Sequence, residues 1–146
     1  MAEEFLSLEE INKRLEDAIH TVIWDRLAEK MEDACGLLEA EGAREAPVDE
    51  GYLRAFIRSQ VETNPQEITG WIGSFTEYAP YVHQGTGIYA VDGKGQKTPW
   101  AWHGESKKWA GWHFTVGQKP NPFLQRAIDK KRGELLFVFK DTLRGL

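Results

Sequence analysis

The chain has 146 residues, a net charge of −5, an aromatic content of 12% and one cysteine, Cys35. This length predicts one domain over residues 1–146 that folds without crosslinks, and the composition excludes a mainly disordered chain. A lone cysteine excludes an intramolecular disulfide and a cysteine metal cluster, and its apolar helical setting favours a buried, unreactive thiol. No apolar run approaches the ~20 residues that span a bilayer, and the acidic N-terminus lacks the features of a signal peptide, so we expect a soluble protein made in the cytoplasm.

The first predicted element is a long amphipathic helix from about residue 8 to about residue 42. Ser7 and Glu10 have the spacing of a capping box, in which each side chain accepts a backbone amide at the helix start. Gly42 is the expected stop. One apolar stripe follows the helix at steps of mostly three, four and five residues, and it comprises Ile11, Leu15, Ala18, Ile19, Val22, Leu27, Met31, Ala34 and Leu38.

A first β-hairpin is predicted after this helix. Asp49 is placed to cap a short turn at residues 51–54. Two strand-like runs then follow at residues 56–63 and 68–74, with an Asn-Pro turn between them. Two glycines in the second run indicate a bulge or a close backbone approach.

A second hairpin is predicted further along the chain. Residues 78–84 have the pattern of one helical turn, which Gly85-Thr86-Gly87 ends. Strands at residues 99–103 and 111–116 flank a polar connection, and alternation of large rings with small or polar residues predicts aromatic side chains on one face.

A last helix completes the chain at about residues 122–143. Asn121 is its expected N-cap and Pro122 its first residue, while Gly133 weakens its middle. The order of helix, strands and helix predicts an α+β fold, with a small antiparallel sheet of two hairpins packed against the N-terminal and C-terminal helices.

Motifs for catalysis or for a cofactor are absent from the sequence. Gly85-Thr86-Gly87 and Gly93-Lys94-Gly95 lack the further residues of a dinucleotide or phosphate-binding loop, so both are interpreted as turns. His103 and His113 could face each other across the second predicted hairpin with Glu105 nearby, but this spacing does not match a zinc site. We therefore expect no enzyme activity, no metal and no cofactor.

Aromatic side chains concentrate between residues 71 and 123, which contain eleven of the seventeen rings and five of the six tryptophans. One hairpin face in a small domain cannot hide four large rings, so a protein interface is favoured. Single-stranded nucleic acid or a sugar would use similar rings, and lysines lie nearby, but the overall acidity argues against binding to phosphates. The predicted subunit-interface residues are Tyr78, Tyr81, Tyr89, Trp100, Trp102, Trp109, Trp112, Lys130, Lys131 and Arg132.

Charge is divided unevenly along the chain. Residues 1–50 contain fifteen acidic and five basic side chains, whereas residues 51–146 contain eight acidic and thirteen basic ones. A solvated acidic helix face explains this pattern simply. The alternative is head-to-tail contact between copies, in which an acidic edge meets a basic edge.

Three segments together resemble the neck and minor-tail protein family of long-tailed bacteriophages. Its members carry A-P-V-D-T-G-x-L-R-x-S-I after a helix, then Y-A-x-Y-V-E-x-G-T, then P-x-P-F-L-x-x-A before a last helix. The corresponding residues here are 46–57, 78–86 and 120–127. Glu50 stands where the family usually has Thr, and His83 stands where an acid is common.

The resemblance implies a non-enzymatic virion protein at the head–tail junction or the top of the tail. Such a protein forms a ring, of six or twelve copies, that joins the head connector to the tail tube. Its implied partners are copies of itself, head-connector or stopper proteins and tail tube or terminator proteins. Duplex DNA passes through the ring without specific binding, and no membrane is involved.

Overall fold

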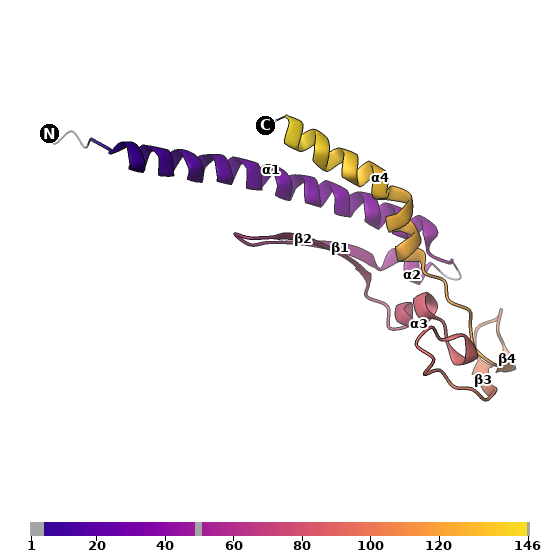
Figure 1. Cartoon of the computed structure of the whole chain (residues 1–146). Helices are drawn as coiled ribbons and strands as arrows, with labels where there is room; N and C mark the ends of the chain where they lie inside the picture. The colour runs from indigo at the N-terminus through magenta and orange to yellow at the C-terminus, as the bar shows by residue number, and fades with distance from the viewer. Residues whose placement is uncertain (1–4, 49–50, 146) are drawn as a thin grey trace.

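The computed structural model describes residues 5–48 and 51–145. Its fold is α+β, as predicted, with a long first helix, a last helix and two antiparallel hairpins between them (Figure 1). In chain order the elements are α1 (Leu8–Glu45), α2 (Tyr52–Ala55), β1 (Ile57–Thr63), β2 (Ile68–Ser74), α3 (Ala79–Gln84), the 3-10 turn η1 (Gly87–Tyr89), β3 (Trp100–Gly104), β4 (Gly111–Thr115) and α4 (Phe123–Arg144).

Helix α1 begins at the predicted capping box. The Glu10 amide donates to the Ser7 hydroxyl over 3.2 Å, and the Ser7 amide donates to the Glu10 carboxylate over 2.8 Å. The predicted stop at Gly42 is wrong, because Gly42 is buried against α4 and the first hairpin and the helix continues to Glu45. It ends at Ala46, whose backbone is extended because Pro47 follows.

The first hairpin lies along one side of α1 (Figure 1). Asn64 closes its turn, since the side-chain oxygen accepts the amides of Gln66 and Glu67 over 2.9 Å each. The pairing is continuous from one end of the ribbon to the other, so there is no bulge. The predicted close approach is found at Gly70, where an added Cβ would lie 2.5 Å from the Cys35 sulfur.

The start of the short helix α2 is at Gly51, which adopts a left-handed backbone with φ of 83°. The predicted capping residue Asp49 lies outside the described residues. Helix α4 is continuous across Gly133, and its N-cap position is taken by Pro122, one residue later than predicted. Asn121 instead donates its backbone amide to the Val82 carbonyl over 2.9 Å and ties this segment to α3.

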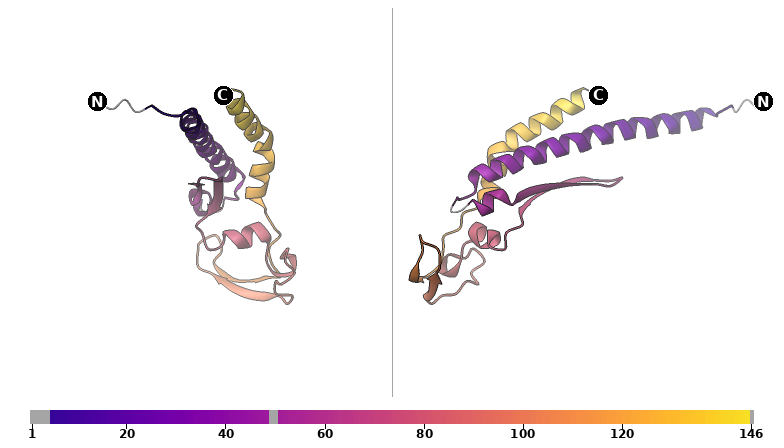
Figure 2. Two further views of the ribbon diagram at one scale, coloured as in Figure 1. Left: turned by 60° about the vertical axis from the view of Figure 1, so that its left-hand side comes forward. Right: turned by 180° about the vertical axis from the view of Figure 1, so that it is seen from behind.

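The two hairpins form separate sheets, and within residues 5–48 and 51–145 the main packing of strands against α1 comes from the first. The second hairpin, β3–β4, lies at the far end of the molecule from the α1 N-terminus (Figures 1 and 2). The prediction that its aromatic rings share one face is wrong. Trp102 pairs with His113 and His103 pairs with Trp112, so alternation along the strands puts Trp100 and Trp102 on one face and Trp112 and Phe114 on the other.

Candidate functional site

The three segments of the phage-protein resemblance meet in one small core. Leu53 and Ile57 come from the first segment, Val82 from the second and Phe123 from the third, and all four are buried. Phe123 has no exposed surface, and its ring meets the His83 ring edge-on with 5.8 Å between centroids. These four side chains are therefore structural.

Backbone hydrogen bonds join the residues that follow α3 to the residues that precede α4. The Thr86 amide donates to the Gln118 carbonyl over 2.9 Å, and the Ile88 amide donates to the Val116 carbonyl over 3.1 Å. Between them Gly87 has φ of 61°, and a Cβ there would overlap the Val116 carbonyl oxygen. Only glycine fits this crossing of two chains.

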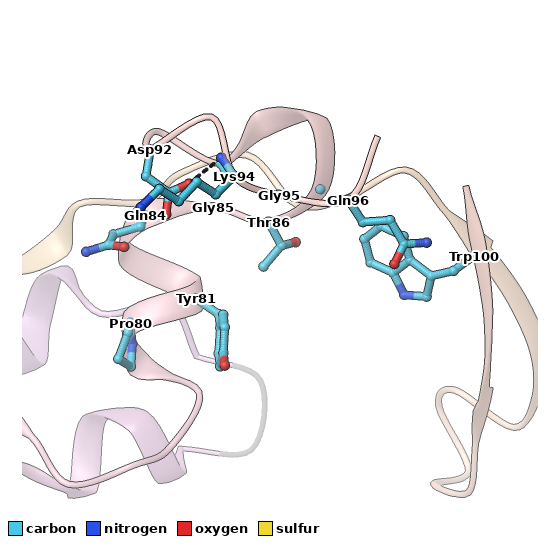
Figure 3. A pocket seen from close by; sticks show the side chains of 12 residues that line it. Pro80, Tyr81, Gln84, Gly85, Thr86, Asp92, Lys94, Gly95, Gln96 and Trp100 are labelled. Carbon is cyan, nitrogen blue, oxygen red and sulfur yellow. Dashed lines mark hydrogen bonds between the residues drawn. The ribbon is translucent and has the colours of Figure 1, made fainter. Parts of the chain in front are cut away.

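A shallow hollow of about 350 Å³ lies beside this crossing (Figure 3). Tyr81 and Trp100 stand on opposite sides of it, with Thr86 between them, and Asp92 and Lys94 lie at one rim. The Asp92 carboxylate accepts the Lys94 backbone amide over 2.9 Å and so fixes the turn of this loop. The hollow contains no nucleophile next to a general base, which is the arrangement that covalent catalysis needs.

The second hairpin carries a ring cluster on one face. Trp102 stacks on His113 at 4.7 Å, Trp109 lies 6.1 Å from Trp102, and the Lys108 ammonium lies 5.3 Å from the Trp109 ring centre. On the opposite face, Trp112 is 71% exposed and meets His103 edge-on. Because His103 and His113 project from opposite faces, they do not converge on a metal.

The predicted interface residues do not form a single patch. Trp102 and Trp109 share the ring cluster, whereas Trp112 lies behind it. Tyr81 and Trp100 line the hollow of Figure 3, while Tyr78 lies on another side of the core, near Pro47 and Gln118. Tyr89 lies under the Lys119 ammonium at 5.9 Å.

The predicted basic cluster is engaged within the chain. Lys130 donates to the Glu45 carboxylate, Lys131 lies 3.9 Å from the buried carboxylate of Glu41, and Arg132 contacts Asp129 at 3.3 Å. The contacts of Lys130 and Lys131, together with a 2.9 Å bond from Arg126 to Glu45, clamp the start of α4 onto the end of α1, whereas the Arg132 pair lies within α4.

Glu45 is the centre of this clamp. The hydrogen bond from Lys130 is the largest cause that holds the pKa of the Glu45 carboxyl below its ordinary value, and the bond from Arg126 is the next. The ion pairs of Glu45 stabilise the junction of α1 and α4. Cations of α4 that could contact a second molecule must therefore lie outside this junction.

The feature that the sequence prediction missed is the first part of α1. From Ser7 to Val22 every residue is exposed, and this segment, here called the arm, extends beyond the first hairpin and beyond α4 (Figures 1 and 2). Its apolar side chains are at least 46% exposed, and they form what we call the arm seam: Leu8, Ile11, Leu15, Ile19 and Val22.

The arm seam is not a continuation of the buried face of α1, although both were predicted as one stripe. At 100° per residue, the centre of the seam lies roughly 150° around the helix from the centre of the later apolar positions, which include Met31, Cys35 and Leu38. The signal in the sequence is the five-residue step from Val22 to Leu27. The first hairpin packs on the later positions, so it does not cover the seam.

The accessible surface of the chain is 11,011 Å². A compact monomer of 16.7 kDa exposes about 7,600 Å², so roughly 3,400 Å² is in excess. Large exposed apolar side chains lie on the arm, on the second hairpin and on α4. Large apolar side chains that are exposed together on one element are typical of surfaces that proteins bury against a partner.

Comparison with protein-family models, with curated proteins and with solved structures gave no match. Among the described residues, no three His, Cys, Asp or Glu side chains are grouped so as to hold a metal ion. Within the same residues, no helix combines the length and the apolar character needed to cross a bilayer.

Proposed function

We propose that this chain is a structural, non-enzymatic virion protein of a long-tailed bacteriophage, placed at the head–tail junction or at the top of the tail. The observation that carries the proposal is the excess of exposed surface, together with the exposed apolar side chains of the arm and of α4. The resemblance of three segments, which meet in a common core, supports the same assignment.

In this role the protein acts as a ring of copies that joins the head connector or stopper to the tail tube or its terminator. A ring uses two different surfaces of each copy, and it closes when the rotation between neighbours is right. Acidic side chains outnumber basic ones overall, and a net negative protein lets duplex DNA pass without holding its phosphates.

The role is tested in a phage whose genome carries this gene. Deletion of the gene is expected to yield DNA-filled heads and separate tails, and expression of the protein from a plasmid should restore joined particles. Negative-stain microscopy of the purified protein should show rings with an open centre. Normal particles after deletion would exclude the joining role.

A second candidate is a nucleic-acid-binding module that uses the second hairpin, because Lys108 and Trp109 lie together there. Base stacking on exposed tryptophan supports binding to single strands. A mobility shift with single-stranded DNA that salt abolishes, and that Trp109→Ala and Trp112→Ala weaken, would favour this module. Absence of any shift at low salt favours the structural role.

A further inference from the structure

The arm presents an apolar face that the chain itself does not cover. Its fifteen helical residues, 8–22, span about 22 Å, and every one of them is exposed. The steps within the arm seam, Leu8, Ile11, Leu15, Ile19 and Val22, are all three or four residues, which is the spacing of a seam that packs on another helix. The arm is therefore built to contact a helix.

Helix α4 carries a matching outer face. Leu136 and Leu143 are seven residues apart, both are more than half exposed, and Gly133 leaves the surface near them flat. Lys140 lies between the two leucines on this face and Arg144 lies at its edge. The segment from Arg132 to Arg144 spans about 20 Å, close to the length of the arm.

Charge favours pairing of the arm with α4 over pairing of two arms. The arm contains four acidic and two basic side chains, whereas α4 contains six basic and three acidic ones. Glu16 lies beside the arm seam, Lys140 lies between the α4 leucines and Arg144 lies at the edge of their face. The described residues give none of these three an ion-pair partner. Two arms side by side would instead place like charges together.

We propose that the arm of one copy docks on the outer face of α4 of the next copy, with the arm seam against Leu136 and Leu143. The proposal rests on the ring proposed above and names its contact surface. The contact is heterologous, so each copy gives an arm and receives one, as a closed ring requires. A standard interface buries about 800 Å² per partner, and two such patches fit within the excess surface of each chain.

The test uses two variants of the full chain and one matched control. Leu15→Ser with Ile19→Ser removes the arm seam, and Leu136→Ser with Leu143→Ser removes the α4 face. Lys13→Ser with Asp17→Ser changes the opposite side of the arm without changing net charge. All changed side chains are exposed, and circular dichroism and thermal unfolding of each variant check that the fold is kept.

Sedimentation velocity over a wide concentration range measures assembly. We expect each leucine or isoleucine variant to weaken self-association by more than about tenfold, and the control to assemble like the wild type. Mixing the two defective variants should give dimers that grow no further, because one contact surface remains intact in each pair. Glu16→Lys should weaken assembly, and Lys140→Glu added to it should restore it.

Other results overturn the proposal and separate it from the proposed function. Assembly of the α4 variant at wild-type strength would mean that arms pair with each other. Rings that form in both variants would place the contact on another surface and leave the joining role intact. A wild-type protein that stays monomeric at high concentration also refutes the docking. If the variants confirm the contact between the arm and α4 but deletion of the gene leaves phage particles normal, the joining role alone is refuted.

Discussion

Phe123 is the side chain on which residues 53–57, 79–82 and 123 converge to form one core, and its removal is the sharpest test of that core. The ring is completely buried among residues from α2, β1 and α3, and it contacts the His83 ring. A Phe→Ala change in a core costs about 3–5 kcal/mol, because the lost transfer free energy adds to that of the cavity. Walls from three separate segments hinder collapse of the cavity, so we expect about 4 kcal/mol.

That loss predicts a large shift in thermal stability. Unfolding entropy of about 2.1 cal/mol/K per residue gives about 0.31 kcal/mol/K for 146 residues, so Phe123→Ala should lower Tm by about 13 °C. The free energy of unfolding can be followed by tryptophan fluorescence in urea at a protein concentration below assembly. Phe75→Ala is the matched control, because that ring is 79% exposed and should cost less than about 0.5 kcal/mol. Equal losses in the two variants, or a loss below about 1 kcal/mol for Phe123→Ala, would refute the proposed core.

Three further changes probe other parts of the structure. Gly87→Ala should lower the free energy of unfolding in urea by at least about 2 kcal/mol, because a left-handed backbone is strained for alanine and its Cβ would overlap the Val116 carbonyl. An unchanged free energy of unfolding would contradict the close crossing of the two chain segments at Gly87. Glu45→Gln should lower Tm at neutral pH. The difference in Tm from wild type should shrink as pH falls below the ordinary carboxyl pKa of about 4.3 and through the lower pKa of the folded state. A difference in Tm that does not change with pH would argue against the clamp with Lys130. Burial raises the pKa of the Cys35 thiol. A thiol reagent at about pH 8 should therefore label the folded protein at least about tenfold more slowly than the urea-unfolded protein. Equal labelling rates would contradict the burial of Cys35.

The local parts of the fold could be predicted from the sequence because their signals are short. The capping box at Ser7 and Glu10 and the turn at Asn64 depend on side chains within three residues of the backbone groups they bind. The end of α1 depended instead on tertiary contacts. Gly42 is a weak helix residue, but its missing side chain makes room for Leu124 and Ile72, so packing keeps the helix intact there.

The face of each ring in the second hairpin could not be predicted from alternation alone. Alternation within one strand says which residues share a face, but the register between strands decides which faces combine. Here Trp102 lies opposite His113 and not opposite Trp112. A shift of one residue would have placed all the large rings together, so the prediction depended on a register that the sequence did not define.

The basic cluster illustrates a different limit of prediction. Lys130 and Lys131 were predicted as interface residues from charge, yet their partners Glu45 and Glu41 are more than eighty residues away in the sequence. Composition cannot tell a cation that pairs within the chain from one that awaits a partner. Further along the same helix, Lys140 and Arg144 have no ion-pair partner among the described residues.

The change of phase within α1 bears most directly on assembly. A helix that served only its own core would keep its apolar residues on one side, because a stripe on another side has nothing to cover it. The step of five residues from Val22 to Leu27 turns the stripe by roughly 140°. The later part of α1 then faces the first hairpin, while the arm seam faces away from it. A single rigid helix thus joins two surfaces that point in different directions, one filled by the chain itself and one open to a neighbour. Rigid continuity through Ile23 and Trp24 would fix the direction in which that neighbour approaches, which is what closure of a ring demands of each contact.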